Sequence, residues 1–299
     1  MEFEFLGIEE LPPTTNMGID EYMMHRSAES KLGVIRFYTV HDAMSIGYAQ
    51  RLKVIMKGEP TFEVFRRPTG GSHVEVDYST LMYAFAAPRD GRFQNYKSMR
   101  LYFDERIAKG LSDLGISSVV ANIETATIDI EGKVIGGDSM LWGKKGALLQ
   151  GLLVIDPYDV EKIKARMPLK SRIIDGEVYR EFDALKNLPA ISTRLNGNQK
   201  QDAKELVADS ILQRLTGGSY EEVKINGEIL NEARKFVDKR YGRRSWLEKH
   251  EPTFTKDEIE ESPGEELEGP LKTLDGYCFY VLVEDADFKR MAEKNEKEC

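Results

Sequence analysis

Cysteine is nearly absent from this sequence of 299 residues, which holds only Cys278 and Cys299. Because both lie near the C-terminus, a disulfide scaffold, a zinc cluster and an upstream cysteine nucleophile are excluded. Long apolar runs are also absent, since none reaches the ~18 residues that a membrane-spanning helix needs. The opening stretch MEFEFLGIEE carries acids where a secretory signal would carry bases. We therefore expect a cytoplasmic protein that does not contact a membrane.

Basic charge is in deficit as well: 42 lysines and arginines stand against 51 aspartates and glutamates, a formal net charge of −9. Polyanions are attracted to basic surfaces, so this balance argues against nonspecific binding to nucleic acid or to membranes. Any anionic ligand must instead meet a local cluster of arginines or lysines. The length allows one large domain and a smaller one, at about 100–200 residues per domain.

We assign residues 1–192 to one α+β domain, because strands, hairpins and helices alternate there without the regular rhythm of a doubly wound sheet. A helix is expected near the N-terminus, with Asn16 as its candidate N-cap. Lys31–Val40 is rich in β-branched and aromatic residues and predicts a strand, whereas apolar residues at helical spacing predict a helix over Met99–Leu114. A hairpin that turns at Glu131-Gly132 is expected after them.

The composition changes after the polar connector AISTRLNGNQKQD. Two apolar stripes at helical spacing, within 203–215 and 229–241, predict a small helical domain over residues 197–248. The remaining residues, 249–299, contain the acidic stretch KDEIEESPGEELE, with seven acids and one lysine, followed by a strand and a helix. This composition is typical of a solvated linker with a short tail.

The stretch FRRPTGGSHVEVD places Arg66 and Arg67 directly before a Gly-Gly turn. Glycines allow a ligand to approach the backbone N–H groups, and guanidinium groups bind phosphate oxygens in pairs, so the stretch could hold a phosphate. A plain hairpin with two surface arginines has the same pattern. Lys133 leaves a similar choice open: it could act as a fixed charge between a carboxylate and a phosphate, or be an exposed hairpin lysine.

Several motifs in order across the chain resemble one family, the lipoate-protein ligases of the biotin/lipoate ligase superfamily. NMGIDEYM resembles the opening helix of that family, and VIRFYTVHDAMSIGYAQ its strand pair. RRPTGGSHVEVD is similar to its Arg-Arg-x-Ser/Thr-Gly-Gly-Gly loop, NIETATIDIEGKVIGG to its Asn…Gly-Lys hairpin, and GALLQGLLVID to its His-Gly-x-Leu-Leu-Leu-Asp strand. The resemblance covers about Asn16 to Trp246.

The resemblance implies a mixed, largely antiparallel sheet flanked by helices, as in biotin/lipoate ligases and class II synthetases, with a small helical C-terminal domain. It also implies an ATP-dependent ligase. Lipoate, or octanoate, and ATP would form an acyl-adenylate, and a lysine of an apo lipoyl domain or of the glycine-cleavage H protein would then displace AMP. Mg²⁺ is expected on the pyrophosphate, and the protein is expected to be a monomer or small homo-oligomer.

The same resemblance implies roles for individual residues. Lys133 would be catalytic, in contact with the acyl carbonyl oxygen and the α-phosphate. Phosphate and adenylate would be bound by Arg66, Arg67, Thr69, Gly70, Gly71, Asp77 and Gly136. The acid would be bound by His73, Val74, Val76, Asn122 and Gln150. Asp138 is a candidate ligand for the magnesium ion.

Departures from the family pattern keep other functions open. Ser72 stands at the third glycine of the loop, and Val76 and Gln150 stand where the family has histidines. A non-catalytic protein on a diverged ligase fold, which binds lipoate or a nucleotide or serves as a scaffold, is therefore an alternative. Octanoyl or lipoyl transfer through a cysteine is disfavoured, because no cysteine lies near the hairpin. A biotin ligase is disfavoured as well, because the Gly-Arg-Gly-Arg-x-Gly loop of that family is absent.

Overall fold

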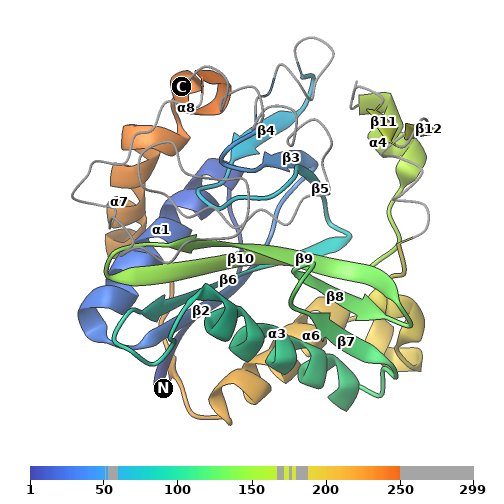
Figure 1. Ribbon diagram of the computed structural model, residues 1–299, viewed down its shortest axis with the longest axis horizontal. Helices are drawn as coiled ribbons and strands as arrows, with labels where there is room; N and C mark the ends of the chain where they lie inside the picture. The colour runs from blue at the N-terminus through green and yellow to red at the C-terminus, as the bar shows by residue number, and fades with distance from the viewer. Residues whose placement is uncertain (51, 53–59, 167–171, 175–176, 180–187, 250–299) are drawn as a thin grey trace.

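A computed structural model gives the arrangement of residues 1–50, 52, 60–166, 172–174, 177–179 and 188–249. Its main feature is an eight-stranded sheet (Figure 1). Strand β1 pairs in parallel with β2 and β13, and the other neighbouring strands are antiparallel, which confirms the predicted α+β fold. In sheet order the strands are β13 (Glu221–Glu222), β1 (Phe3–Glu10), β2 (Gly33–Thr39), β6 (Thr80–Pro88), β10 (Gly146–Val154), β9 (Lys133–Trp142), β8 (Thr127–Ile130) and β7 (Val119–Asn122).

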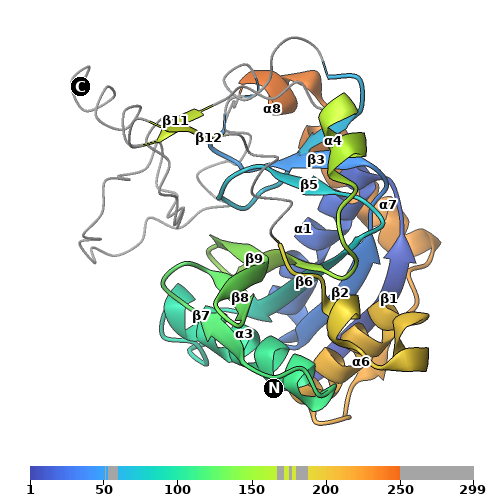
Figure 2. The ribbon, with the colours of Figure 1, turned by 90° about the vertical axis from the view of Figure 1, so that its right-hand side faces the viewer.

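Strand β6 shows how the sheet divides the interior into two cores. All of its residues are buried, and successive side chains point to opposite faces of the sheet. Tyr83 and Phe85 join the core under one pair of helices, whereas Met82 and Ala84 join the core under another pair (Figures 1 and 2). The first pair is α3 (Tyr96–Asp113) and α6 (Ala203–Thr216), and the second is α1 (Pro13–Ser30) and α7 (Gly227–Phe236).

The helices beyond residue 200 share these two cores. Val207 and Ile211 of α6 are fully buried with the residues of α3, and Ala233 of α7 is fully buried with those of α1. Within the described residues they have no core of their own, although the sequence pattern predicts a separate small domain over 197–248. The two helical stripes themselves are present as expected, the second continuing into a π-helical turn, η3 (Val237–Tyr241).

Helix α1 begins at Pro13, so the prediction of Asn16 as its N-cap is wrong. Proline has no N–H group, and it fits the first position of a helix because an N–H group there would have no acceptor within the helix. Asn16 lies inside the helix and is fully buried. Its Nδ2 donates to the Leu11 carbonyl oxygen at 2.8 Å, and its Oδ1 accepts from Arg36 at 2.6 Å. Its amide therefore joins α1 to the sheet.

A second, three-stranded sheet lies beside the α1 face and carries the arginine-glycine stretch (Figure 2). Its strands are β3 (Ala43–Ile46), β4 (Glu63–Arg66) and β5 (Val74–Val76), in the order β4-β3-β5. No helix in the described part of the chain has the length and apolarity to cross a membrane. The remaining elements are α4 (Val160–Arg166), β11 (Arg172–Ile174), β12 (Glu177–Tyr179), η1 (Ile191–Arg194), η2 (Gly197–Lys200) and α8 (Arg244–Lys249).

Candidate functional site

A cavity of about 260 Å³ lies where α1 and the two sheets meet. One part of its wall is apolar and includes Met17, Val74, Met82, Leu152 and Val154. Another part carries polar groups, among them Tyr38, Ser45, Arg67, Ser139 and Gln150. An apolar slot with a few polar groups at its wall suits a small organic ligand that has an apolar tail and a polar head.

Arg67 holds the glycine turn in place from within the cavity wall. Its guanidinium group donates to the carbonyl oxygens of Gly70, at 2.5 and 3.0 Å, and Ser72, at 2.7 Å. A trans peptide points its N–H away from its carbonyl, so the N–H groups of Gly71 and His73 point away from this guanidinium. Gly71 has a φ of +88°, which suits glycine, and it lines the cavity together with Ser72.

The charge of Arg67 has no carboxylate partner among the described residues. Its other hydrogen bonds go to the hydroxyls of Ser139, at 3.3 Å, and Ser45, at 3.2 Å, and to the Ser45 carbonyl oxygen at 3.4 Å. Burial lowers the pKa of Arg67 to about 10, so the group remains protonated at neutral pH. The cavity wall thus contains a fixed positive charge.

A continuous row of hydrogen bonds leads from this wall into the interior. Ser139 donates to Thr69, and Thr69 donates to Gln150, both at 2.8 Å. Gln150 then donates to the carboxylate of Asp20 at 2.6 Å. Thr69 is fully buried, which places the threonine of the arginine-glycine stretch behind the cavity wall. The row connects the glycine turn, β9, β10 and α1.

Asp20 and Arg36, which were not among the predicted site residues, end this row as a fully buried ion pair at 3.2 Å. Tyr38 also donates to Asp20, at 3.0 Å. Burial raises the pKa of Asp20, while Arg36, Gln150 and Tyr38 oppose that rise. The sequence does indicate such a pair: Arg36 is a charged residue within the apolar strand VIRFY, and a charge on a buried strand needs a partner of opposite charge.

Arg66 lies outside the cavity lining and is occupied by backbone carbonyl groups. It donates to Gly47, Tyr48 and Gln50 at 2.6–2.9 Å and, across the chain, to Trp246 and Leu247 at 2.7–2.8 Å. These bonds fix helix α8 to β4. A phosphate-binding role for Arg66, expected from the sequence, would require this residue to leave its present partners.

Lys133 and Asn122 lie next to residues of the cavity wall but outside it. Lys133 is the first residue of β9 and is exposed, while its neighbour Val134 and the Gly136 position line the cavity. Asn122 ends β7 and accepts from the Thr125 N–H at 3.3 Å, so it shapes the turn that brings Thr125 and Ala126 into the wall. Neither Lys133 nor Asn122 is itself part of the lining.

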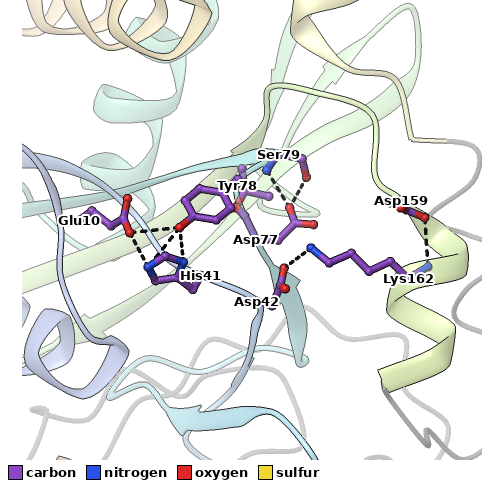
Figure 3. A network of polar contacts seen from close by, with 9 residues as sticks. Glu10, His41, Asp42, Asp77, Tyr78, Ser79, Asp159 and Lys162 are labelled. Atoms are coloured by element: carbon purple, nitrogen blue, oxygen red, sulfur yellow. Dashed lines mark hydrogen bonds and ion pairs between the residues drawn. The ribbon is translucent and has the colours of Figure 1, made fainter.

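Three other predicted site residues lie away from the lining. Asp77 accepts from the N–H of Ser79 at 2.8 Å and from its hydroxyl, and thus stabilises the turn between β5 and β6 (Figure 3). Val76 is buried in the core under α1. His73 is buried with its Nδ1 at 3.4 Å from the Gln50 amide nitrogen. Val74 and Gln150 are the expected acid-binding residues that the structure brings into the cavity wall.

Asp138 borders the cavity through its backbone, because its side chain is fully buried and forms an ion pair with Arg100 of α3 at 2.8 Å. In the described part of the chain, no group of three or more His, Cys, Asp or Glu side chains could hold a metal ion. The carboxylate of Asp138 is therefore engaged with Arg100, and its role as a magnesium ligand, expected from the sequence, stays a prediction.

Behind Asp138 lies a second buried carboxyl group, Asp104 of α3. Burial, together with the adjacent negative charge of Asp138, raises the pKa of Asp104 well above its usual value of 3.8. Asp138 is the group that keeps its charge, since it pairs with Arg100. The folded state therefore holds a proton on Asp104 that the unfolded state releases above pH 3.8.

We expect Asp104→Asn to be more stable than the unmodified protein at alkaline pH and nearly equal to it in acid. The reason is that a raised carboxyl pKa stabilises the fold below the unfolded pKa, and this contribution is lost as pH rises through the folded pKa. Urea unfolding at pH 5 and pH 8 measures the effect. An equal pH dependence in the two proteins would contradict it, and Asp209→Asn on the exposed face of α6 is the control.

Comparisons with known proteins agree with this geometry. The profile of the lipoyl protein ligase A/B catalytic domain matches residues 12–181, more than half of the chain. No curated protein sequence matches the chain. Among solved structures, a lipoate-protein ligase A bound with ATP is 18% identical with a TM-score of 0.66, and the match covers 83% of this chain and 98% of that one.

Two further structures match over similar lengths. The bi-partite lipoate protein ligase of Thermoplasma acidophilum, solved with its E2 lipoyl domain, is 18% identical with a TM-score of 0.66, over 83% of this chain and 96% of that one. P. falciparum LipL1 in complex with lipoate is 14% identical with a TM-score of 0.63, over 84% and 76%. At these identities the structural similarity establishes the fold.

Proposed function

This chain belongs to the family of lipoyl protein ligase A/B catalytic domains, and from that premise we propose that it is an ATP-dependent lipoate-protein ligase. In the first step a carboxylate oxygen of lipoate or octanoate attacks the α-phosphorus of ATP, and the bond to pyrophosphate breaks. In the second step the amine nitrogen of an acceptor lysine bonds to the acyl carbon. The bond between the acyl carbon and the bridging oxygen breaks, so AMP leaves with that oxygen, and the nitrogen releases protons to solvent until one hydrogen remains in the amide.

The observation that carries the proposal is the uncompensated charge of Arg67 beside an apolar slot. Joining a carboxylate to a phosphate brings two anions together, and a fixed cation in a water-poor site reduces their repulsion. Met17, Met82 and Leu152 would contact the alkyl chain, while Arg67 and the turn at Gly71 would lie near its activated end. The relatives solved with ATP and with lipoate support both ligands.

Lys133 would supply a second charge at the mouth. Its side chain leaves β9 on the α3 face, because it pairs with Ile130 of the α3 core, so its long exposed stem would have to bend around the end of the hairpin to bring the ammonium group to the carboxylate and the α-phosphate. Arg67 would stay in place because its bonds to Gly70 and Ser72 also form the turn. Mg²⁺ would bring its own charge to the pyrophosphate, and the described residues offer it no protein cage.

The test is incubation of the protein with ATP, Mg²⁺ and lipoate, octanoate or biotin, with and without an apo lipoyl domain. We expect pyrophosphate release with lipoate or octanoate and a mass increase of the acceptor by one acyl group. Pyrophosphate without acceptor modification would indicate a first step that needs a further partner for the second. No pyrophosphate with any of the acids would contradict the ligase.

The alternative function is a non-catalytic protein that binds lipoate or a nucleotide. One observation favours it: Arg66 donates five hydrogen bonds to backbone carbonyl groups and so is not free to bind a phosphate. Of the two arginines in the stretch, Arg67 is the one that lines the cavity. Calorimetric titration with lipoate distinguishes the two: binding without pyrophosphate release in the presence of ATP would establish the alternative.

A further inference from the structure

Helix α8 lies beside β4 and contacts its last residue through one tryptophan, Trp246 (Figure 1). The side chain of Trp246 is 1% exposed, and its Nε1 donates to the carbonyl oxygen of Arg66 at 3.0 Å. In the other direction, Nε of Arg66 donates to the carbonyl oxygen of Trp246 at 2.8 Å. Two residues that are 180 positions apart thus exchange hydrogen bonds, and Trp246 fixes the place of Arg66.

Arg66 connects this contact to the chain that follows β3. Its Nη1 donates to the carbonyl oxygens of Gly47, Tyr48 and Gln50 at 2.6–2.9 Å. The N–H of Tyr48 in turn donates to the carbonyl oxygen of Thr69 at 2.9 Å, just before the glycine turn. The segment after β3 and the start of the turn are therefore held against each other on the side where Arg66 lies.

Arg67 is the next residue, and its side chain leaves the backbone towards the cavity. Neighbouring side chains of an extended chain point to opposite sides, which agrees with Arg67 in the cavity lining and Arg66 outside it. The N–H of Arg67 donates to the Ile46 carbonyl oxygen at 3.0 Å and continues the pairing of β3 with β4. A shift of Arg66 would therefore move the base of the Arg67 side chain, and with it the fixed charge.

The segment that carries Trp246 is anchored on α1. Tyr241 donates to Glu21 of α1 at 2.7 Å, and Arg240 forms an ion pair with the same carboxylate at 3.0 Å. All three side chains are buried. The ring of Trp246 packs edge-on against that of Tyr241, with 5.6 Å between the ring centroids. A continuous set of buried contacts thus leads from α1 through Tyr241 and Trp246 to β4.

We infer that Trp246 is a positioning residue for the cavity: through Arg66 it sets the place of the Arg67 guanidinium group. The effect on rate rests on the proposed ligase function, in which the charge of Arg67 reduces the repulsion between carboxylate and phosphate. Trp246 itself lies outside the cavity lining, so it acts without touching a ligand. A misplacement of about 1 Å in a group that acts on the transition state costs up to about 10²-fold in rate.

Trp246→Phe tests the inference, because it keeps an aromatic ring in the core and removes the Nε1–H donor. We expect kcat for pyrophosphate release, with ATP and lipoate, to fall about tenfold, while KM for lipoate rises no more than about threefold. Tyr241→Phe is the matched control. It also removes one buried donor from the same segment, so it should lower the melting temperature by a similar amount and leave kcat within about twofold. Equal falls of kcat in the two variants would overturn the inference.

A double-mutant cycle with Arg67→Gln shows whether Trp246 acts through Arg67. Without the guanidinium charge there is nothing left for Trp246 to position, so Trp246→Phe should change kcat less than about twofold in the Arg67→Gln background. A tenfold loss that is the same in both backgrounds would mean that the two residues act independently, and would contradict the positioning role.

A binding measurement separates this inference from the proposed function. Absence of pyrophosphate from the unmodified protein would contradict the ligase, and calorimetric titration with lipoate then takes the place of kcat. Trp246→Phe should weaken lipoate binding about threefold when Arg67 is present and leave it unchanged in the Arg67→Gln background. A Kd that Trp246→Phe leaves unchanged in both backgrounds would overturn the positioning role of Trp246 in a binding protein.

Discussion

Replacing Arg66 with alanine should lower the free energy of unfolding by about 4 kcal/mol, because the change leaves several buried carbonyl groups without their charged donor. Arg66 is 2% exposed, and its five hydrogen bonds join β4, the residues after β3 and helix α8. Urea unfolding followed by circular dichroism measures the change.

Arg194→Ala is the matched control for this prediction. Arg194 is exposed and donates to Glu131 through two of its three guanidinium nitrogens, at 2.8 and 3.2 Å, yet an exposed pair of this kind contributes at most about 1 kcal/mol. A loss below about 1 kcal/mol in Arg66→Ala, accompanied by weaker ATP binding, would show that Arg66 serves the phosphate as the family resemblance implies.

Lys133→Ala should reduce the rate of acyl-adenylate formation by about 10²–10³-fold or more, because it removes a positive charge from a transition state that joins two anions. The fold should stay intact, since Lys133 is exposed at the first position of β9. Pyrophosphate release at saturating ATP and lipoate measures the rate, and the melting temperature reports the fold.

The control for Lys133→Ala is Lys144→Ala, which removes another exposed lysine, from the turn at the other end of β9. We expect that variant to retain its activity. Adenylate formation that survives in Lys133→Ala would overturn the catalytic role of this lysine. A melting temperature that falls by more than a few degrees would mean that the lysine serves the fold instead.

Local patterns predicted the elements next to the site well. The hairpin at Glu131-Gly132 is confirmed, and both residues have positive φ, 53° and 74°, as a two-residue hairpin turn requires. The strand expected at Lys31–Val40 is β2, Gly33–Thr39, and the helix expected at Met99–Leu114 is α3, which begins three residues earlier, at Tyr96. Alternation and helical spacing are local properties, so they can be read along the chain.

Contacts between distant segments could not be read in this way. Arg66 bonds to Trp246, 180 positions along the chain, and Gln150 bonds to Asp20, 130 positions away. Nothing in the sequence RRPTGG distinguishes an arginine that binds a phosphate from one that donates hydrogen bonds to a helix near the C-terminus. The ion pair of Asp138 could not be predicted for the same reason, because its partner Arg100 lies 38 positions away on α3.

The contact between Gly47 and the glycine turn limits how the cavity can move. A Cβ atom at Gly47 would lie 1.9 Å from the Gly71 carbonyl oxygen, so the end of β3 and the turn are in direct backbone contact. Arg67 bonds to Ser45 and Gly70 together. The turn is therefore not a loop with hinges of its own. Because Arg67 and Thr69 also bond to Ser139 and Gln150 of the eight-stranded sheet, the turn is held between both sheets, and a ligand would meet a wall that is already in place before it binds.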